Sequence, residues 1–342
     1  MTPQQLIREH PSGSAESALE AAIDALRQAN RDYPCAAFEE ALIDLRIRGF
    51  GEVPFAAPQN PPRPGPAPVA NGQLAEIDAK DLTAAVLSDA VESGAGLIVR
   101  NLMPAELIER MKAYIDRALQ VRSEAGDSFP EGAARRWYAR SSAVAGGPQQ
   151  FWSKDKAQHS PDFGSLWMVD SPAAAEEMTA FYHRLGLREL LQQCFGEPAV
   201  LSVKKWVLRK ATPKTHSGWH QDGRFLGQGI RSINLWVSLS TCGGDTSAPG
   251  MEILADQHKR IHDTGTRGAM FDWIVGPELV DELAQDTPVL TPEFAPGDAI
   301  FFDHYNLHRT QCNPRQTDYR YAVESWFFAA SRAPAKQYPL LF

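Results

Sequence analysis

Cysteine is scarce in this sequence, with four residues in 342. The four are Cys35, Cys194, Cys242 and Cys312. They lie far apart and form no CxxC pair, so neither a disulfide framework nor a thiolate zinc site is expected. This cysteine usage fits a reducing cytoplasm. No stretch approaches the roughly 18 apolar residues of a membrane span. The first residues lack the basic-then-apolar pattern of a signal peptide. We therefore expect a cytoplasmic protein.

The sequence also lacks an excess of positive charge. Lysine and arginine total 34 against 42 acidic residues, and the net charge is −8. This balance argues against nucleic acid or an anionic membrane as a partner, although it allows a local basic pocket for an acidic small molecule. There is no internal repeat and no glycine-rich dinucleotide fingerprint. A hydrophobic fraction of 43% and a charged fraction of 22% are ordinary for a soluble globular protein.

Apolar periodicity and proline content divide the chain into three parts. Helices are expected over 14–29 and 38–47 from helical spacing of leucine and isoleucine. Seven prolines from position 54 to position 68 predict an extended polyproline segment. We therefore expect an N-terminal helical appendage over 1–53, a proline-rich linker or strap over 54–72, and a main domain over 73–342.

The main domain changes from helical to β texture along its length. Helices are expected over 81–92, after Pro104 and over 172–194, with a strand at Gly96–Arg100 and a long irregular loop over 122–170. From about 199 to 330, short β-like runs alternate with turns, as in a sandwich or barrel. These runs are 200–209, 215–222, 233–239, 252–255, 298–302 and 319–328. The predicted fold class is α+β, with helices preceding an all-β core.

His220 and Asp222 are two residues apart, so on a strand they would project from the same face. One more histidine would complete the 2-His-1-carboxylate ligand set of non-haem Fe(II) oxygenases. The candidates in the remaining sequence are His258, His262, His304 and His308. A turn followed by an apolar strand leads to both His304 and His308, and this pattern favours His308 slightly.

Arg320 begins a run that otherwise reads as a buried strand. A buried guanidinium needs an anionic partner, because an unpaired buried charge is very costly. A bound carboxylate would fit the guanidinium in a bidentate fork. A structural salt bridge, for instance to Glu324, is the alternative.

Taken together, these motifs resemble those of the phytanoyl-CoA dioxygenase family of Fe(II)/2-oxoglutarate oxygenases. The resemblance spans about 94–329. The matching motifs are Trp219-His220-Gln221-Asp222, Leu235–Leu239, and the run from Pro296-Gly297-Asp298 through His308-Arg309-Thr310 to Asn313 and Arg320. It implies a double-stranded β-helix (jelly-roll, cupin-like) core over about 199–330 with flanking N-terminal helices.

The resemblance also implies roles for individual residues. Iron would be held by His220, Asp222 and His308, and Arg320 would bind the far carboxylate of 2-oxoglutarate. Thr310 and Trp236 would line the co-substrate pocket, and Lys210 or Trp206 would correspond to a lysine region on the strand before the metal motif. The family's proline-glycine-serine-histidine turn is replaced here by Met251–His258, so His258 is expected to be structural or to face the substrate.

The implied reaction couples conversion of 2-oxoglutarate and O2 into succinate and CO2 to the oxidation of a C–H bond in a small-molecule substrate. Related halogenases replace the carboxylate ligand with a small residue, so Asp222 favours hydroxylation, or desaturation or ring formation, over halogenation. The substrate is expected at the 122–170 loop, through Arg135, Arg136, Tyr138 and Trp152. The alternatives are a jelly-roll metalloprotein with other chemistry and a non-catalytic binding protein. The partner of Arg320 and the completeness of the ligand set distinguish them.

Overall fold

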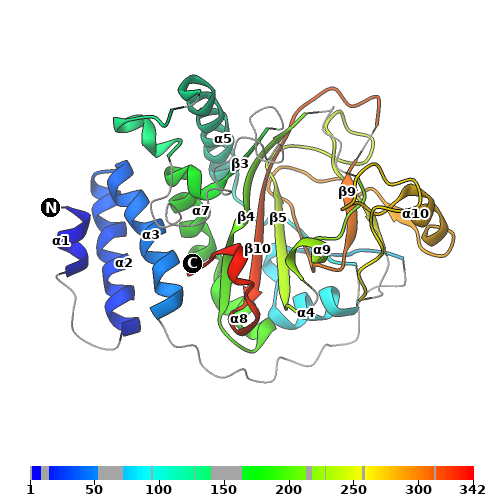
Figure 1. Cartoon of the computed structure of the whole chain (residues 1–342), viewed down its shortest axis with the longest axis horizontal. Coiled ribbons are helices and arrows are strands. Elements are labelled where there is room, and N and C mark those ends of the chain that lie inside the picture. Colours follow the sequence, from blue (N-terminus) through cyan, green and yellow to red (C-terminus); the bar gives the residue numbers. More distant parts are fainter. Residues whose placement is uncertain are drawn as a thin grey trace.

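The computed structural model shows a mixed α+β chain in which helices pack on one side of a large sheet (Figure 1). It describes residues 2–8, 15–52, 72–93, 95–126, 128–139, 164–212, 218–227, 229–255, 259–311 and 313–342. The helices in these ranges include α1 (Pro3–Arg8), α2 (Ala15–Asp32), α3 (Ala36–Glu52), α4 (Ala84–Ser93), α5 (Ala105–Ala125), α7 (Pro172–Leu185), α8 (Leu187–Phe195), α9 (Gly223–Leu226) and α10 (Pro277–Leu283). Within these ranges, none of the helices combines the length and the apolar character needed to span a bilayer.

Two sheets form the β core. The larger has the order β1-β2-β8-β5-β10-β4-β11, with β3 also paired to β4, and the smaller has the order β7-β6-β9. All described pairs are antiparallel except β1 with β2. The strands are β1 (Ala75–Asp78), β2 (Leu97–Arg100), β3 (Ser165–Trp167), β4 (Ala199–Ala211), β5 (Ser232–Ser238), β6 (Met251–Leu254), β7 (Val289–Leu290), β8 (Ala299–Phe302), β9 (Leu307–Thr310), β10 (Arg320–Ala329) and β11 (Pro339–Leu340).

The large sheet buries a different core on each face. One core joins Met251 and Ile253 of the small sheet to Trp236, Phe302 and Trp326 of the large sheet, so the two sheets face each other. The other core lies between the large sheet and helices α4, α5, α7 and α8. Burial on both faces explains why β8 is apolar throughout and why apolar side chains lie on both faces of β5 and β10. This arrangement agrees with the predicted double-stranded β-helix core and its flanking helices.

The predicted helix over 172–194 is two helices. Gly186 ends α7 in the left-handed region at φ 66°, and its N–H donates back to the carbonyls of Tyr182 and His183. Glycine occupies this conformation without steric cost. The chain then starts again as α8 in a new direction, and α8 packs against α4 and β4.

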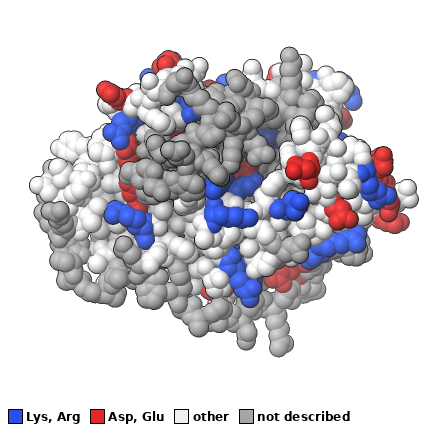
Figure 2. Space-filling view, viewed as in Figure 1, with Lys and Arg blue, Asp and Glu red and all other residues white. Residues whose placement is uncertain are grey.

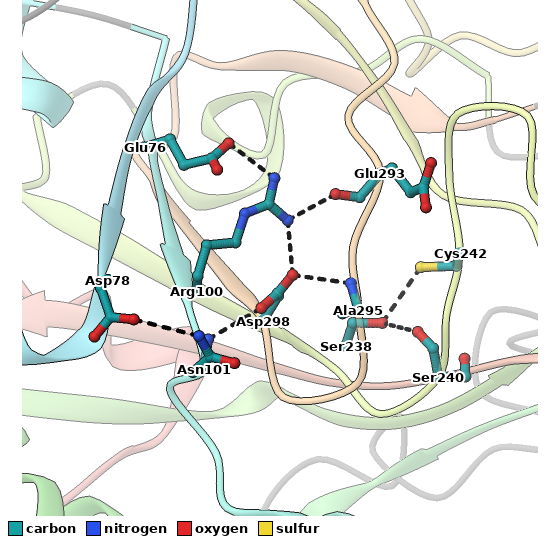
Figure 3. A network of polar contacts seen from close by, with 10 residues as sticks. All are labelled: Glu76, Asp78, Arg100, Asn101, Ser238, Ser240, Cys242, Glu293, Ala295 and Asp298. Atoms are coloured by element: carbon teal, nitrogen blue, oxygen red, sulfur yellow. Dashed lines mark hydrogen bonds and ion pairs between the residues drawn. The ribbon is translucent and has the colours of Figure 1, made fainter.

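The Pro296-Gly297-Asp298 turn is fixed by a buried carboxylate (Figure 3). Asp298 accepts hydrogen bonds from the Arg100 guanidinium at 2.7 Å and from the N–H groups of Asn101 and Ala295 at 3.0 and 2.8 Å. Arg100 also contacts Glu76 at 2.8 Å. Asp298 thus ties the ends of β1 and β2 to the start of β8, the strand that leads to the candidate histidines.

The N-terminal helices pack directly on the main domain. The backbone N–H of Leu341, next to β11, donates to the carbonyl of Arg46 in α3, and the Arg46 guanidinium donates to the carbonyl of Leu341. Arg27 of α2 forms an ion pair with Glu176 of α7 at 3.3 Å. The proposed proline-rich strap over 54–72 lies outside the described residues except for Gly72.

Candidate active site

The structure brings His220, Asp222 and His308 together. One ligand atom from each side chain lies within 4.8 Å of the others. His220 and His308 form an isolated antiparallel bridge, with N–H to carbonyl distances of 3.0 and 3.1 Å in the two directions. Residues 88 positions apart are thereby held side by side, and their ring centroids are 4.4 Å apart. Across the described ranges, this is the one cluster of its kind.

Both imidazoles are oriented by their own backbone. Nδ1 of His220 lies 2.8 Å from the carbonyl oxygen of Gly218, and Nδ1 of His308 lies 3.1 Å from that of Asn306. A carbonyl accepts a hydrogen bond, so each ring carries its proton on Nδ1 and leaves Nε2 as a free lone pair. This is the arrangement of metal-binding histidines, in which the second nitrogen fixes the tautomer.

Asp222 reaches the cluster from a helical turn rather than from a strand. Its backbone has φ −64° and ψ −22°, and it immediately precedes α9. The strand expected over 215–222 is therefore wrong at Asp222, and residues 213–217 lie outside the described ranges. The carboxylate Oδ1 accepts a hydrogen bond from the Lys205 ammonium at 2.6 Å.

Burial sets the charge state of these groups. It lowers the pKa of His220 to about 4 and also lowers that of His308, so both rings are neutral at physiological pH. Burial alone would raise the pKa of Asp222, but Lys205 and the two imidazoles outweigh it and hold that pKa below the ordinary value. Two neutral imidazoles and one carboxylate suit a divalent cation such as Fe(II).

The other histidine candidates lie elsewhere. Nδ1 of His304 is 2.9 Å from Ser232 Oγ, and the His304 side chain is not among the clustered ligands. His262 is buried and its N–H donates to Gln221 at 2.7 Å. His258 lies outside the described residues.

A cavity of about 90 Å³ adjoins His220 and His308. Its cationic side chains outnumber its acidic ones, which suits a dianionic ligand. Two of the predicted co-substrate residues, Thr310 and Trp236, lie at its wall. The full lining is Lys205, Arg209, His220, Asn234, Trp236, Met251, Phe302, His308, Arg309, Thr310, Arg320 and Glu324.

Arg320 is buried in this cavity with 3% of its surface exposed. Its Nη1 donates to the carbonyls of Pro249 and Gly250 at 3.2 and 2.8 Å, and the guanidinium lies 5.5 Å from the centroid of the Trp236 ring. Among the residues that the structure describes, its Nε finds no hydrogen-bond partner. Burial lowers the pKa of Arg320 to about 10, which leaves it charged at neutral pH.

The structural salt bridge considered for Arg320 is not formed. Glu324 pairs with Arg209 at 2.7 Å, and no ion pair of Arg320 exists within the described part of the chain. The buried Asn234 Oδ1, on the same cavity wall, also lacks a partner. A bound carboxylate would satisfy the Arg320 guanidinium, so the cavity fits one end of 2-oxoglutarate.

Basic side chains also gather near the middle of the face in Figure 2, where Figure 1 draws β4, β5 and β10. This local concentration contrasts with the net charge of −8 for the whole chain. An acidic ligand would be attracted to this part of the surface.

Lys210 and Trp206 lie on the opposite face of β4 from the cavity. Lys210 pairs with Asp116 of α5 at 2.6 Å. The indole N–H of Trp206 donates to the hydroxyl of Tyr182 in α7 at 3.2 Å. Neither residue lines the cavity that contains Arg320.

A β-bulge explains the displacement. Ser325 pairs with Trp206, whereas Phe327 pairs with Leu201, so β4 holds extra residues between these positions. An extra residue reverses the alternation of side chains beyond it. As a result, Lys205 and Arg209 face the cavity.

Two of the predicted substrate residues form ion pairs with α3. Arg135 and Arg136, in the 3-10 helix η2 (Gly132–Arg136), form ion pairs with Glu40 and Glu39 of α3. Tyr138 is buried and stacks on Phe129, with ring centroids 5.9 Å apart. None of these residues lines the cavity, and Trp152 lies outside the described residues.

Sequence reasoning missed Lys205, Arg209, Asn234 and Met251 at the cavity. The spacing of Lys205 and Arg209 was a usable signal, since residues four apart on a strand share a face. Asn234 precedes Trp236 by two positions and shares its face for the same reason. Met251 comes from the small sheet, and nothing in its local sequence identifies it.

A sequence model of the phytanoyl-CoA dioxygenase (PhyH) family matches residues 94–317. No curated protein matches the chain at a significant level.

Several solved structures resemble the chain in part. AviO1 from Streptomyces viridochromogenes Tue57 is 16% identical, with 74% of this chain and 97% of that chain covered and a TM-score of 0.43. EctD from S. alaskensis, solved with 2-oxoglutarate and 5-hydroxyectoine, is 14% identical, with 74% and 79% covered and a TM-score of 0.48. The carbocyclase SnoK from nogalamycin biosynthesis is 13% identical, with 73% and 85% covered and a TM-score of 0.45. At this level of identity and superposition, these likenesses do not define the activity of this chain.

Proposed function

Because the chain belongs to the phytanoyl-CoA dioxygenase family, we propose that it is an Fe(II)- and 2-oxoglutarate-dependent oxygenase that hydroxylates a small-molecule substrate. His220, Asp222 and His308 are proposed to hold the ion. Arg320 is proposed to bind the far carboxylate of 2-oxoglutarate, with Thr310 and Trp236 beside it.

The observation that carries this proposal is the state of Arg320. It is a buried cation in the cavity next to the three clustered ligands, and it pairs with no carboxylate in the described ranges. A metal hydrolase or isomerase of the same fold would have no use for such a group. A non-catalytic binding protein would have no need to keep all three ligands in place.

When bound, Fe(II) with 2-oxoglutarate and O2 supplies the oxidising power that removes hydrogen from a C–H bond, while 2-oxoglutarate becomes succinate and CO2. The protein's own groups prepare the site. The carbonyls of Gly218 and Asn306 keep the two Nε2 atoms unprotonated and aimed at one point. Lys205 keeps Asp222 ionised and fixes one of its oxygens. The carboxylate ligand favours hydroxylation over halogenation, since it leaves no position for a halide.

A turnover screen tests the proposal. Purified protein with Fe(II), 2-oxoglutarate and O2 is incubated with a broad panel of metabolites, and succinate is quantified by mass spectrometry. At least one compound should stimulate succinate formation, and His308→Ala should abolish the stimulated rate. If no compound stimulates the rate and calorimetry detects no 2-oxoglutarate binding, the proposed function is refuted.

A further inference from the structure

A group of aromatic side chains, two half-buried and one exposed, adjoins His220. We call Phe225, Phe271 and Trp273 the aromatic shelf. The Trp273 ring lies 5.9 Å from the His220 ring at 79°, and 5.8 Å from Phe225. Phe271 stacks on Trp273 with centroids 5.9 Å apart and only 10° between the planes. The shelf therefore extends from a proposed metal ligand to the protein surface.

The shelf is held by an ordered loop that leads into α10. Val275 N–H donates to the carbonyl of Trp219 at 2.8 Å, directly before His220, and Gly265 N–H donates to Ile274 at 3.0 Å. Ile274 packs against Gly218, where an added Cβ would come within 2.8 Å of the isoleucine. The position of the shelf is thus fixed to the metal site through the backbone.

Core packing does not explain the shelf. The loop is anchored by Ile274 and Val275, which are 5% and 1% exposed. Phe271 is 55% exposed and its neighbour Met270 is 83% exposed, so they contribute little to folding. An exposed apolar surface continuous with a polar site is typical of a ligand-binding region.

The shelf also meets the polar side of the site. The Lys205 ammonium, which contacts Asp222 at 2.6 Å, lies 5.4 Å from the centroid of the Phe225 ring. A molecule lying on Trp273 would therefore have flat aromatic faces on one side and the proposed metal ligands at its edge.

Building on the proposed function, we propose that the aromatic shelf binds the planar, unsaturated ring system of the substrate and places its edge next to the metal. Stacked and edge-to-face contacts favour a flat ring over a saturated one of the same size. The side chains of Trp273 and Phe271 determine this preference, and the loop from Gly265 to Gly276 keeps them in place.

Binding close to the metal can be measured without turnover. The protein is loaded with Mn(II) and 2-oxoglutarate, and paramagnetic broadening of ligand protons is recorded by NMR for 1-naphthoate and for its saturated counterpart, decahydro-1-naphthoate. 1-Naphthoate should be broadened and should bind roughly three- to tenfold more tightly than the saturated compound. Trp273→Leu should remove this preference, whereas Tyr33→Leu, an aromatic with 79% exposure after α2, should leave it intact.

Phe271→Leu provides the same test at an exposed position if Trp273→Leu does not fold. Equal binding of the two probes, or an unchanged preference in both leucine variants, would overturn the inference. A concentration-dependent dimer that is lost in Phe271→Leu would also overturn it, because the shelf would then bind a second copy of the chain. Calorimetry of 2-oxoglutarate on the same samples separates the two proposals: if 2-oxoglutarate binds and neither probe does, only the shelf inference fails.

Discussion

Replacing Arg320 with methionine should weaken 2-oxoglutarate binding strongly while leaving the folded protein almost as stable. The substitution keeps an unbranched apolar side chain but removes the guanidinium. In the wild type, this group is buried and unpaired with any acid across the described residues. The guanidinium therefore lowers the stability of the unliganded protein and strengthens the binding of a carboxylate.

The magnitudes follow from the contacts. A bidentate guanidinium–carboxylate pair contains two charge-assisted hydrogen bonds worth about 1.5–3 kcal/mol each. Their loss corresponds to a rise in the 2-oxoglutarate Kd of roughly 100-fold or more. Without ligand, the variant loses the hydrogen bonds to the carbonyls of Pro249 and Gly250 and the contact of the guanidinium with the Trp236 ring. The carbonyl of Gly250 keeps a second donor in Gln311. The free energy of unfolding should change by no more than about 1 kcal/mol, since removing an unpaired buried charge offsets the loss.

The assay combines calorimetry of 2-oxoglutarate with urea denaturation of the unliganded protein. Lys210→Met is the matched control, because Lys210 lies on the far face of β4 and pairs with Asp116; its 2-oxoglutarate Kd should stay within about twofold of the wild type. If Arg320→Met unfolds at much lower urea and still binds 2-oxoglutarate normally, Arg320 is a structural residue and the reasoning is refuted.

Three further predictions concern the metal ligands, their lysine and the cysteines. His308→Ala should abolish retention of Fe(II) measured by elemental analysis while His304→Ala should retain it, because His304 is bonded to Ser232 instead; the reverse result would transfer the ligand role to His304. Lys205→Met removes the ion-pair partner of the buried Asp222 carboxylate, so the free energy of unfolding of the metal-free protein should fall by about 3 kcal/mol or more. Added Mn(II) should restore most of this lost stability in a thermal melt. If Mn(II) restores none of it, the result argues against Asp222 as a metal ligand. Burial raises the pKa of Cys194 to about 11 and also raises that of Cys242, so at pH 8 only about a thousandth of Cys194 is thiolate. Both cysteines should resist alkylation by iodoacetamide until urea unfolds the chain, which peptide mass spectrometry can follow. Rapid labelling of either cysteine in the native protein would contradict its buried position.

Local patterns predicted the longer strands of the β core. The strands over 199–211, 232–238, 299–302 and 320–329 follow the predicted runs closely, because each is apolar and bounded by turns. Spacing singled out His220 and Asp222 and left both His304 and His308 open as the third ligand, and the family resemblance selected His308 and gave Arg320 its expected role. The bridge between His220 and His308 could not be derived from spacing, because it pairs a residue of β9 with one 88 positions earlier that lies outside any strand.

The failures come from long-range context. The β-bulge in β4 moved Lys210 and Trp206 to the helix side, and nothing in the sequence of β4 alone marks it. Arg135 and Arg136 were expected to meet a substrate, but their partners Glu39 and Glu40 lie almost a hundred residues earlier on α3. Charged residues in a loop show that a partner exists without showing which one. The aromatic shelf went unnoticed because Phe271 and Trp273 are about fifty residues from His220 in the sequence and meet it only in the folded chain.

The most direct test of the central claim is an anomalous difference map at the iron edge, from crystals grown without oxygen in Fe(II) and 2-oxoglutarate. The account predicts one strong peak between His220, Asp222 and His308, with the far carboxylate of 2-oxoglutarate on the Arg320 guanidinium. A map with no peak at this cluster, or with iron bound elsewhere and Arg320 facing only protein, would contradict it.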